Sequence, residues 1–192
     1  MTTIATDRLL LRPVHTADAA ALFPLFADPA VLRWLARPPM PYTLDDMVAF
    51  LDRVTSHDNR QRGPDRETYL VIERQGAAIG GISWRLREAD HVQAGAGPHL
   101  AFWLGRPSWG HGFMPEAARH VVRHLFTAPA VDAVYDAVYS GAFVGNTPSR
   151  RVHNKLGFER TGMTRLRSNP QNADLPLINM RLRRTHFEAP QS

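Results

Sequence analysis

The chain of 192 residues contains no cysteine. Disulfide bonds, thiolate metal sites and catalysis through a cysteine nucleophile are therefore excluded. Long apolar segments are also missing, because no stretch approaches the ~18 apolar residues of a membrane helix. Residues 1–15 lack the basic and apolar regions of a signal peptide. We therefore expect a cytoplasmic protein with no membrane partner.

Motifs for nucleotide and metal binding are missing as well. The chain has no Gly-x-x-x-x-Gly-Lys-[Ser/Thr] segment and no Gly-x-Gly-x-x-Gly after a first strand, so nucleotide hydrolysis and dinucleotide redox chemistry lack their usual phosphate cradle. His120 and His124 have helical i, i+4 spacing, but no glutamate lies between them in an HExxH pattern and no third ligand is evident. The sequence therefore predicts no metal site.

Negative charge is scarce in the C-terminal third of the chain. Residues 150–186 hold nine Lys and Arg against two acidic residues, whereas the first 149 residues hold 14 against 15. Such a basic segment can bind nucleic acid, a phosphorylated cofactor or an acidic protein, or can form a solvated face. Charge alone discriminates weakly among these, and we do not expect nucleic acid to be the main partner.

The pattern of apolar residues predicts a single α/β domain over residues 1–192. Pro24 is expected to kink or split the first helix. A hairpin followed by alternating helices and strands favours a mixed, mostly antiparallel sheet of about six to seven strands with helices on both faces. We expect strands at 8–14, 69–74, 77–87, 100–104, 133–139 and 177–183, helices at 17–27, 28–35, 44–54, 115–127 and 147–156, and a loop at 89–98.

The segment from Leu100 to Ala118 combines an apolar strand, a loop with Gly110 and Gly112, and a helix start at Pro115. Glycines let the backbone approach a ligand closely, while the first turn of a helix offers unpaired N–H groups and about half a positive charge. We expect this junction to bind the phosphates of a cofactor.

A second segment, from Asn146 to Phe158, contains Asn-x-x-Ser followed by Lys-Leu-Gly-Phe. Together with the glycine loop, this segment resembles the GCN-five-related N-acetyltransferases, the GNAT superfamily, and within it the ribosomal-protein N-terminal acetyltransferases. The resemblance covers nearly the whole chain. It implies a GNAT-like fold and transfer of an acetyl group from acetyl-CoA to a primary amine by direct attack, without a covalent acetyl-enzyme. The matching residues are Thr6 to Leu9, Leu11, Arg12, Ile79, Gly80, Trp103, Trp109 to Phe113, Glu116, Ala117, Asn146, Ser149, Val152 and Lys155 to Phe158.

The resemblance also implies which residues bind the cofactor. The backbone of the strand Phe102, Trp103 and Leu104 is expected to meet the pantetheine arm. The amides of the loop are expected to cradle the pyrophosphate, from Trp109 and Gly110 through His111 and Gly112 to Phe113. Family members often have Gln or Arg where this chain has Pro107, which leaves the adjacent Arg106 as a phosphate-binding candidate or an exposed loop residue.

The catalytic candidates come from the second segment. By resemblance, Asn146 and Ser149 lie near the thioester, and Asn146 can cap a helix at the same time. His153 stands seven residues after Asn146, where many relatives have a tyrosine that protonates the departing thiolate. A histidine can donate that proton near neutral pH, or it can simply pack at the edge of the core, and Ser149 is the competing donor.

The acceptor amine must be neutral to attack. Near pH 7 an α-amino group is roughly a tenth to a quarter neutral, whereas a lysine amine is below ~0.1% neutral. A protein N-terminal α-amine, which the resemblance suggests, therefore needs only a modest base. The sequence does not rank the base candidates, which are Glu116, His111, Tyr139, Asp136 and His99.

Two other functions stay open. A small-molecule amine can be the acceptor in the same chemistry, with the helices before residue 55 and Trp109 forming the pocket wall. The chain can also be a non-catalytic acyl-CoA-binding regulatory module. We expect a monomer or a homodimer.

Overall fold

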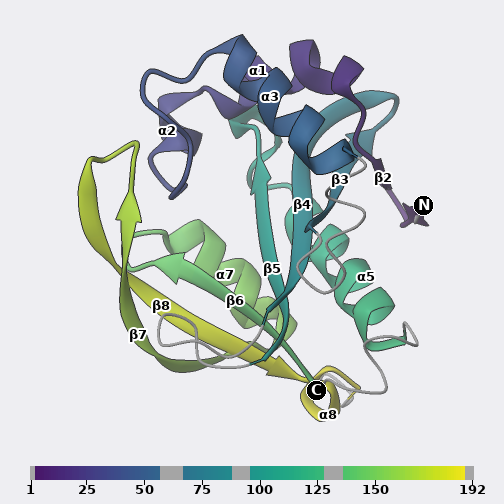
Figure 1. The fold of residues 1–192 in the computed structure, drawn as a ribbon. Helices are drawn as coiled ribbons and strands as arrows, with labels where there is room; N and C mark the ends of the chain where they lie inside the picture. Colours follow the sequence, from purple (N-terminus) through teal and green to yellow (C-terminus); the bar gives the residue numbers. More distant parts are fainter. Residues whose placement is uncertain (1–2, 57–66, 88–95, 128–135, 189–192) are drawn as a thin grey trace.

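The computed structural model describes residues 3–56, 67–87, 96–127 and 136–188 (Figure 1). The strands are β1 (Ile4–Ala5), β2 (Leu10–Pro13), β3 (Glu67–Arg74), β4 (Ala77–Arg87), β5 (Gly97–Leu104), β6 (Ala137–Phe143), β7 (Glu159–Ser168) and β8 (Ala173–Arg183). The helices are α1 (Ala19–Phe26), α2 (Pro29–Leu32), α3 (Leu44–Thr55), α5 (Phe113–Thr127), α7 (Thr147–Leu156) and α8 (Arg184–Glu188), with 3-10 turns at Thr16–Asp18 and Arg106–Ser108.

The described strands form one eight-stranded sheet in the order β1-β2-β3-β4-β5-β6-β8-β7. Every neighbouring pair is antiparallel except β5 and β6, which run parallel. The predicted mixed, mostly antiparallel sheet is confirmed, with more strands than expected. The strands β1 and β7 were not predicted, because β1 has two residues and β7 alternates charged and small residues along a largely exposed edge.

Helices cover both faces of the sheet, as predicted, because successive side chains of a strand point to opposite sides. In β3, Leu70 and Ile72 pack into the core cluster that contains the buried side of α5. Val71, between them, packs into a second cluster with residues of α1 and α3. The α7 residue Leu156 belongs to the first cluster, so α5 and α7 share one face.

Local signals set several helix ends. Asn146 caps the start of α7, and Gly157 ends it in the left-handed conformation at φ 87°. Both ends of this helix agree with the prediction. The helix α1 runs through Pro24 without splitting, and α5 begins at Phe113, two residues earlier than predicted. The predicted strand at 133–139 lies partly outside the described residues, and β6 continues to Phe143.

The strands β5 and β6 separate along their length, as Figure 1 shows. They share one register pair, His99 with Tyr139. On its other edge β5 pairs with β4 from Gly97 to Leu104. The edge of β5 that faces β6 is therefore without a strand partner beyond the start of the strand, on the side where α5 and α7 begin.

Candidate active site

A cavity of about 440 Å³ lies where β5 and β6 separate. Its walls come from three parts of the chain that are far apart in sequence: α2 with the segment after it, the run from β5 into α5, and α7 with its capping residue. The lining residues are Val31, Trp34, Leu35, Phe102, Trp103, Leu104, Ser108, Trp109, Gly110, Gly112, Phe113, Met114, Pro115, Asn146, Pro148, Ser149, Arg151, Val152 and Lys155.

The loop before α5 uses glycine for its backbone conformation. Gly110 has φ +80° and Gly112 has φ +78°, values that residues with a side chain adopt only under strain. A Cβ added at Gly110 would meet no atom within 4 Å, so conformation and not crowding requires glycine there. Among the described residues, the N–H groups from Gly110 to Met114 find no hydrogen-bond acceptor. These donors and the positive end of α5 make the loop an anion-binding surface.

Two further contacts shape this loop. The indole Nε1 of Trp109 donates to the carbonyl of Leu104 at 2.7 Å, which ties the loop to the end of β5. The ring of His111 stacks on Phe113 at a centroid distance of 5.4 Å, and His111 is not among the lining residues. Arg106, the candidate phosphate ligand, pairs with Asp28 at 2.9 Å.

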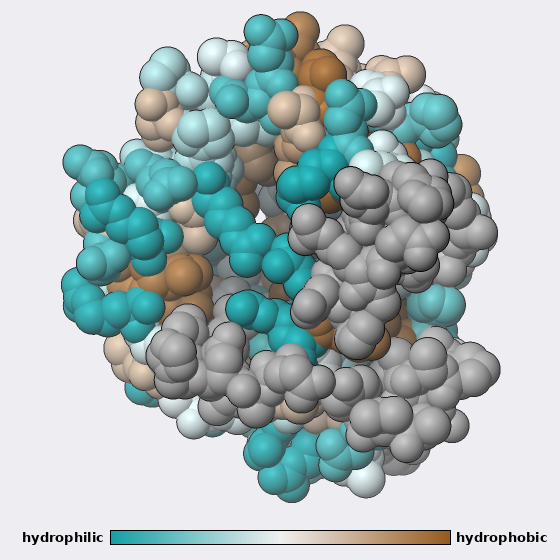
Figure 2. Space-filling model, viewed as in Figure 1, coloured by the Kyte–Doolittle hydropathy of each residue, from teal (hydrophilic) through white to brown (hydrophobic). Residues whose placement is uncertain are grey.

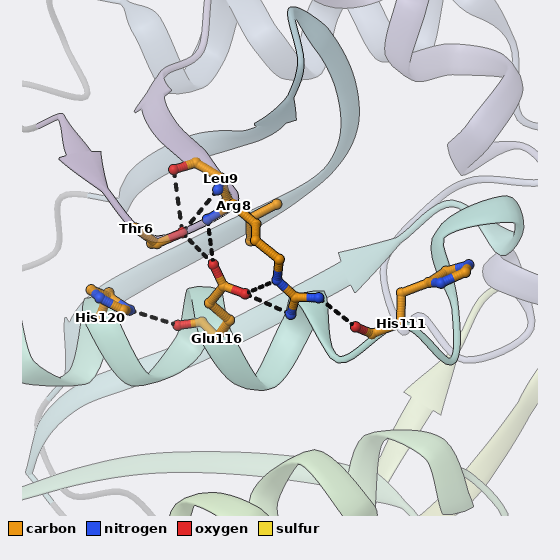
Figure 3. Close-up of polar contacts among 6 residues, drawn as sticks. All are labelled: Thr6, Arg8, Leu9, His111, Glu116 and His120. Carbon is orange, nitrogen blue, oxygen red and sulfur yellow. Dashed lines mark hydrogen bonds and ion pairs between the residues drawn. The ribbon is translucent and has the colours of Figure 1, made fainter.

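A carboxylate clamp formed by Glu116, Arg8 and Thr6 connects the loop to the segment before β2 (Figure 3). Glu116 accepts hydrogen bonds from Thr6 Oγ1 at 2.6 Å, from the Arg8 N–H at 2.9 Å and from Arg8 Nε at 2.7 Å. Arg8 also donates through Nη1 to the carbonyl of His111 at 3.1 Å. The turn between β1 and β2 is therefore joined to the first turn of α5 and to the glycine loop.

The contacts of this clamp determine the protonation state of Glu116. Burial by itself would raise the pKa of Glu116, but the hydrogen bonds from Thr6 and Arg8 outweigh it and hold the pKa below its usual value. Glu116 therefore stays ionised and fully engaged near neutral pH, a role that suits a structural anchor better than a base. The sequence contained both partners in its family-like positions, but it gave no sign that they touch.

The start of α7 brings two predicted catalytic residues into the cavity wall. The side chain of Asn146 accepts a hydrogen bond from the Ser149 N–H at 3.2 Å, so Asn146 caps the helix while it lines the cavity. The Ser149 hydroxyl has no hydrogen-bond partner among the described residues, and Ser149 also lines the cavity. Their placement leaves the Ser149 O–H available to a ligand.

The structure places His153 behind the cavity wall. Its side chain is 0% exposed, and it is not a lining residue. Its Nε2 lies 2.8 Å from Ser140 Oγ, and its ring packs between Phe102 and Phe158. Burial lowers the pKa of His153 to about 4, against a weaker opposing effect of the Ser149 carbonyl. The imidazole is therefore neutral near pH 7.

Of the remaining base candidates, Asp136 is exposed just before β6, and His99 and Tyr139 lie on the sheet face away from α7. His99 and Tyr139 stack at 5.2 Å with an interplanar angle of 17°. Tyr139 points away from α7 because its neighbour Ser140 points toward it. Figure 2 shows hydrophilic side chains around a hollow near the centre of the face presented in Figure 1. In register, a polar row crosses the strands from Glu67 through Arg85, His99, Tyr139 and Arg181 to Glu159.

A strap formed by residues 33–37 closes the cavity on the side of α2. The turn between β7 and β8 holds this strap through side chains that donate to main-chain carbonyls: Ser168 Oγ to Leu35 at 3.1 Å and Asn169 Nδ2 to Arg37 at 3.0 Å. Trp34 lies against Gly145, where an added Cβ would meet the indole at 3.1 Å. The strap residues Trp34 and Leu35 line the cavity, but they follow the end of α2, and the expected helical wall before residue 55 is represented in the lining by Val31.

The histidines at helical spacing in α5 have other partners. The ring of His120 hydrogen-bonds the Glu116 carbonyl at 3.0 Å, and His124 packs against Trp84 at 6.0 Å. No group of three or more His, Asp or Glu side chains in the described ranges has the arrangement of a metal site. None of the helices in the part of the chain that the structure describes has the length and apolar character to cross a bilayer.

The chain has recognisable relatives. It matches the model of the acetyltransferase (GNAT) domain over residues 8–159. It is 26% identical over 167 residues to the uncharacterized N-acetyltransferase p20 of Bacillus licheniformis, covering 86% of each chain. Among solved structures it resembles Mycobacterium smegmatis RimJ in complex with CoA-disulfide, with a TM-score of 0.79, 21% identity and coverage of 100% of this chain and 90% of that one. It also resembles the ribosomal-protein-S5-alanine acetyltransferase of Vibrio fischeri, with a TM-score of 0.74, 16% identity and coverage of 98% and 100%.

Proposed function

The chain belongs to the GNAT acetyltransferase family, and on this premise we propose that it transfers the acetyl group of acetyl-CoA to a primary α-amine, with a protein N-terminus as the acceptor. The observation that carries the proposal is the cavity itself. It joins an anion-binding glycine loop, an unpaired strand edge and the helix start with Asn146 and Ser149.

The cavity fits an elongated cofactor with phosphates at one end. The free N–H groups from Gly110 to Met114 would hold the pyrophosphate. The unpaired edge of β5 at Phe102 to Leu104 would hydrogen-bond the amides of the pantetheine arm, as an added strand does. When bound, acetyl-CoA supplies the acetyl group as a thioester, and transfer to the amine releases the CoA thiol.

Ser149 is the proposed proton donor to the departing sulfur, and its hydroxyl regains the proton that the attacking amine loses. Its hydroxyl has no described partner, and it stands in the first turn of α7, whose positive end stabilises a developing thiolate. Asn146 would hold Ser149 in place through its bond to the Ser149 N–H. His153, the other donor that the resemblance suggests, lies outside the lining, and we give the proton-transfer role to Ser149 alone.

The charge of the cavity supports an α-amine as the acceptor. Of the described lining residues, the charged ones are Arg151 and Lys155, and none is acidic. A cationic amine is disfavoured there, and no carboxylate in the described wall removes its proton. An acceptor with pKa near 8 is neutral about two hundred times more often at pH 7 than a lysine amine with pKa near 10.4. The ribosomal-protein-S5-alanine acetyltransferase of Vibrio fischeri is named for a ribosomal-protein substrate, which agrees with this class.

Binding and turnover separate the possible functions. Acetyl-CoA should raise the melting temperature, because a ligand at a hundred times its dissociation constant stabilises the folded state by about 2.7 kcal/mol. Release of free thiol should then occur with peptides that have a free α-amine and stop when that amine is blocked and only a lysine amine remains. Ser149→Ala should reduce kcat, whereas Ser56→Ala, outside the cavity, should not.

Other outcomes would point elsewhere. Binding of acetyl-CoA without turnover on any amine would indicate a regulatory module. Turnover on small amines but not on peptides would indicate a small-molecule acetyltransferase. Failure to bind acetyl-CoA would overturn the proposal.

A further inference from the structure

A buried serine and histidine stand at the point where β5 and β6 separate. Ser140 in β6 is 8% exposed and His153 in α7 is 0% exposed. Ser140 Oγ donates to the Leu100 carbonyl of β5 at 2.9 Å, and His153 Nε2 lies 2.8 Å from the same oxygen of Ser140. The two side chains therefore connect β6 to β5 and α7, the two elements of this group that contribute residues to the cavity wall.

The hydrogen-bond directions follow from the donors available. The Ser140 hydroxyl has one hydrogen, which it donates to Leu100, so its oxygen accepts from His153 Nε2–H. A neutral imidazole with its proton on Nε2 satisfies this chain, which runs from His153 through Ser140 to Leu100. No proton donor or acceptor of the cavity takes part in it.

The Ser140 hydroxyl occupies a carbonyl of β5 at the point where main-chain pairing with β6 stops. The register pair of β5 and β6 is His99 with Tyr139, and Leu100 and Ser140 are the next residues along the two strands. At that step a side chain of β6, and not its backbone, reaches the carbonyl of β5. The parallel ladder ends there, and the two strands are held apart beyond it.

His153 links this point to the ligand-facing residues of α7. Its ring packs on Phe102 at 5.2 Å, and Phe102 lines the cavity. One residue earlier on α7, Val152 lines the cavity, and so does Ser149. A shift of His153 would therefore move the strand edge and the helix start together.

The pair is retained at a cost to stability. His153 Nδ1 is buried with no hydrogen-bond partner among the described residues. An apolar side chain of similar volume between Phe102 and Phe158 would avoid that unsatisfied group. Packing alone does not explain a histidine here.

We propose that Ser140 and His153 are positioning residues that hold β5, β6 and α7 at the separation required to admit the acyl-CoA arm. The inference rests on the proposed use of this cavity for acetyl-CoA. It assigns His153 no contact with the reacting atoms.

The test compares Ser140→Ala, His153→Leu, the double variant and His153→Gln, which keeps an N–H donor. Ser83→Ala is the matched control, because Ser83 is a 5% exposed serine in β4 on the opposite face of the sheet. The KM for acetyl-CoA, kcat, its pH profile and the melting temperature are measured for each variant, after binding of acetyl-CoA by the wild type is established.

A positioning role predicts a KM for acetyl-CoA raised five- to tenfold in Ser140→Ala and in His153→Leu, with kcat within twofold and an unchanged pH profile. The KM of the double variant should be no higher than that of the worse single variant, because each substitution already breaks the same chain of hydrogen bonds. His153→Gln should recover part of the loss. Ser83→Ala should keep the wild-type KM.

Two results would overturn the inference. One is an unchanged KM in Ser140→Ala, which decides the question even if His153→Leu does not fold. The other is a fall in kcat with an altered pH profile in His153→Leu alone, which would make His153 the proton donor. Absence of acetyl-CoA binding by the wild type would overturn the proposed function instead.

Discussion

Acidification from pH 7 to pH 5 should destabilise the protein through His153. Burial lowers the pKa of this side chain from 6.5 to about 4 in the folded state. Between these two values the unfolded chain binds a proton that the folded chain does not, so stability falls as the pH falls. Above pH 6.5 both states are mostly neutral at this position, and protonation of His153 costs the folded state almost nothing.

The magnitude follows from proton linkage. With a pKa of 6.5 in the unfolded chain and about 4 in the folded chain, the free energy of unfolding decreases by about 2 kcal/mol from pH 7 to pH 5. For a protein of this size that change corresponds to roughly 4–8 °C in melting temperature. Other groups titrate in the same range, so the contribution of His153 must be isolated by a variant.

The assay is urea unfolding of the wild type and His153→Leu at pH 7, 6 and 5, followed by tryptophan fluorescence. The variant should lose about 2 kcal/mol less than the wild type between pH 7 and pH 5. Ser140→Ala keeps the buried imidazole, and its pH dependence should follow that of the wild type. Equal losses in His153→Leu and the wild type would refute the buried, neutral histidine.

Three other predictions concern the cavity. Gly110→Ala should raise the KM for acetyl-CoA about fivefold, because holding a residue with a side chain at φ +80° costs about 1 kcal/mol of backbone strain in the loop. The KM for acetyl-pantetheine, which has no pyrophosphate, should not change. Arg8→Ala should weaken acetyl-CoA binding several-fold in calorimetry, since it removes the hydrogen bond to the loop carbonyl of His111. Unchanged binding would show that the loop keeps its conformation without Arg8. Gly145→Ala should press on Trp34 and raise the KM for the acceptor in steady-state kinetics, whereas Gly162→Ala, with no atom within 4 Å, should behave as the wild type.

Local signals made several parts of the site predictable. The ends of α7 could be read from Asn146 and Gly157, because a cap and a left-handed glycine act within a few residues of the chain. The glycine loop could be read in the same way, since Gly110 and Gly112 precede an abrupt helix start and both have positive φ. These features depend on backbone conformation, which neighbouring residues largely determine.

The parts that could not be predicted depend on contacts between distant segments. The clamp joins Glu116 to Thr6 across 110 positions of sequence, and no periodicity reports such a contact. The strand β7 was missed because its side chains alternate without a clear apolar face, and pairing with β8 decides its conformation.

The sequence by itself determined the class of fold, the glycine conformation of the loop before α5 and the capped helix with Asn146 and Ser149. Tertiary structure alone decided what each ionisable side chain can do. Ser149 and His153 lie one turn apart on the same face of α7. Ser149 lines the cavity, whereas His153 is buried because Phe102 and Phe158 pack against its ring. Burial and partners determine the pKa of a group, and the order of residues along the chain contains neither.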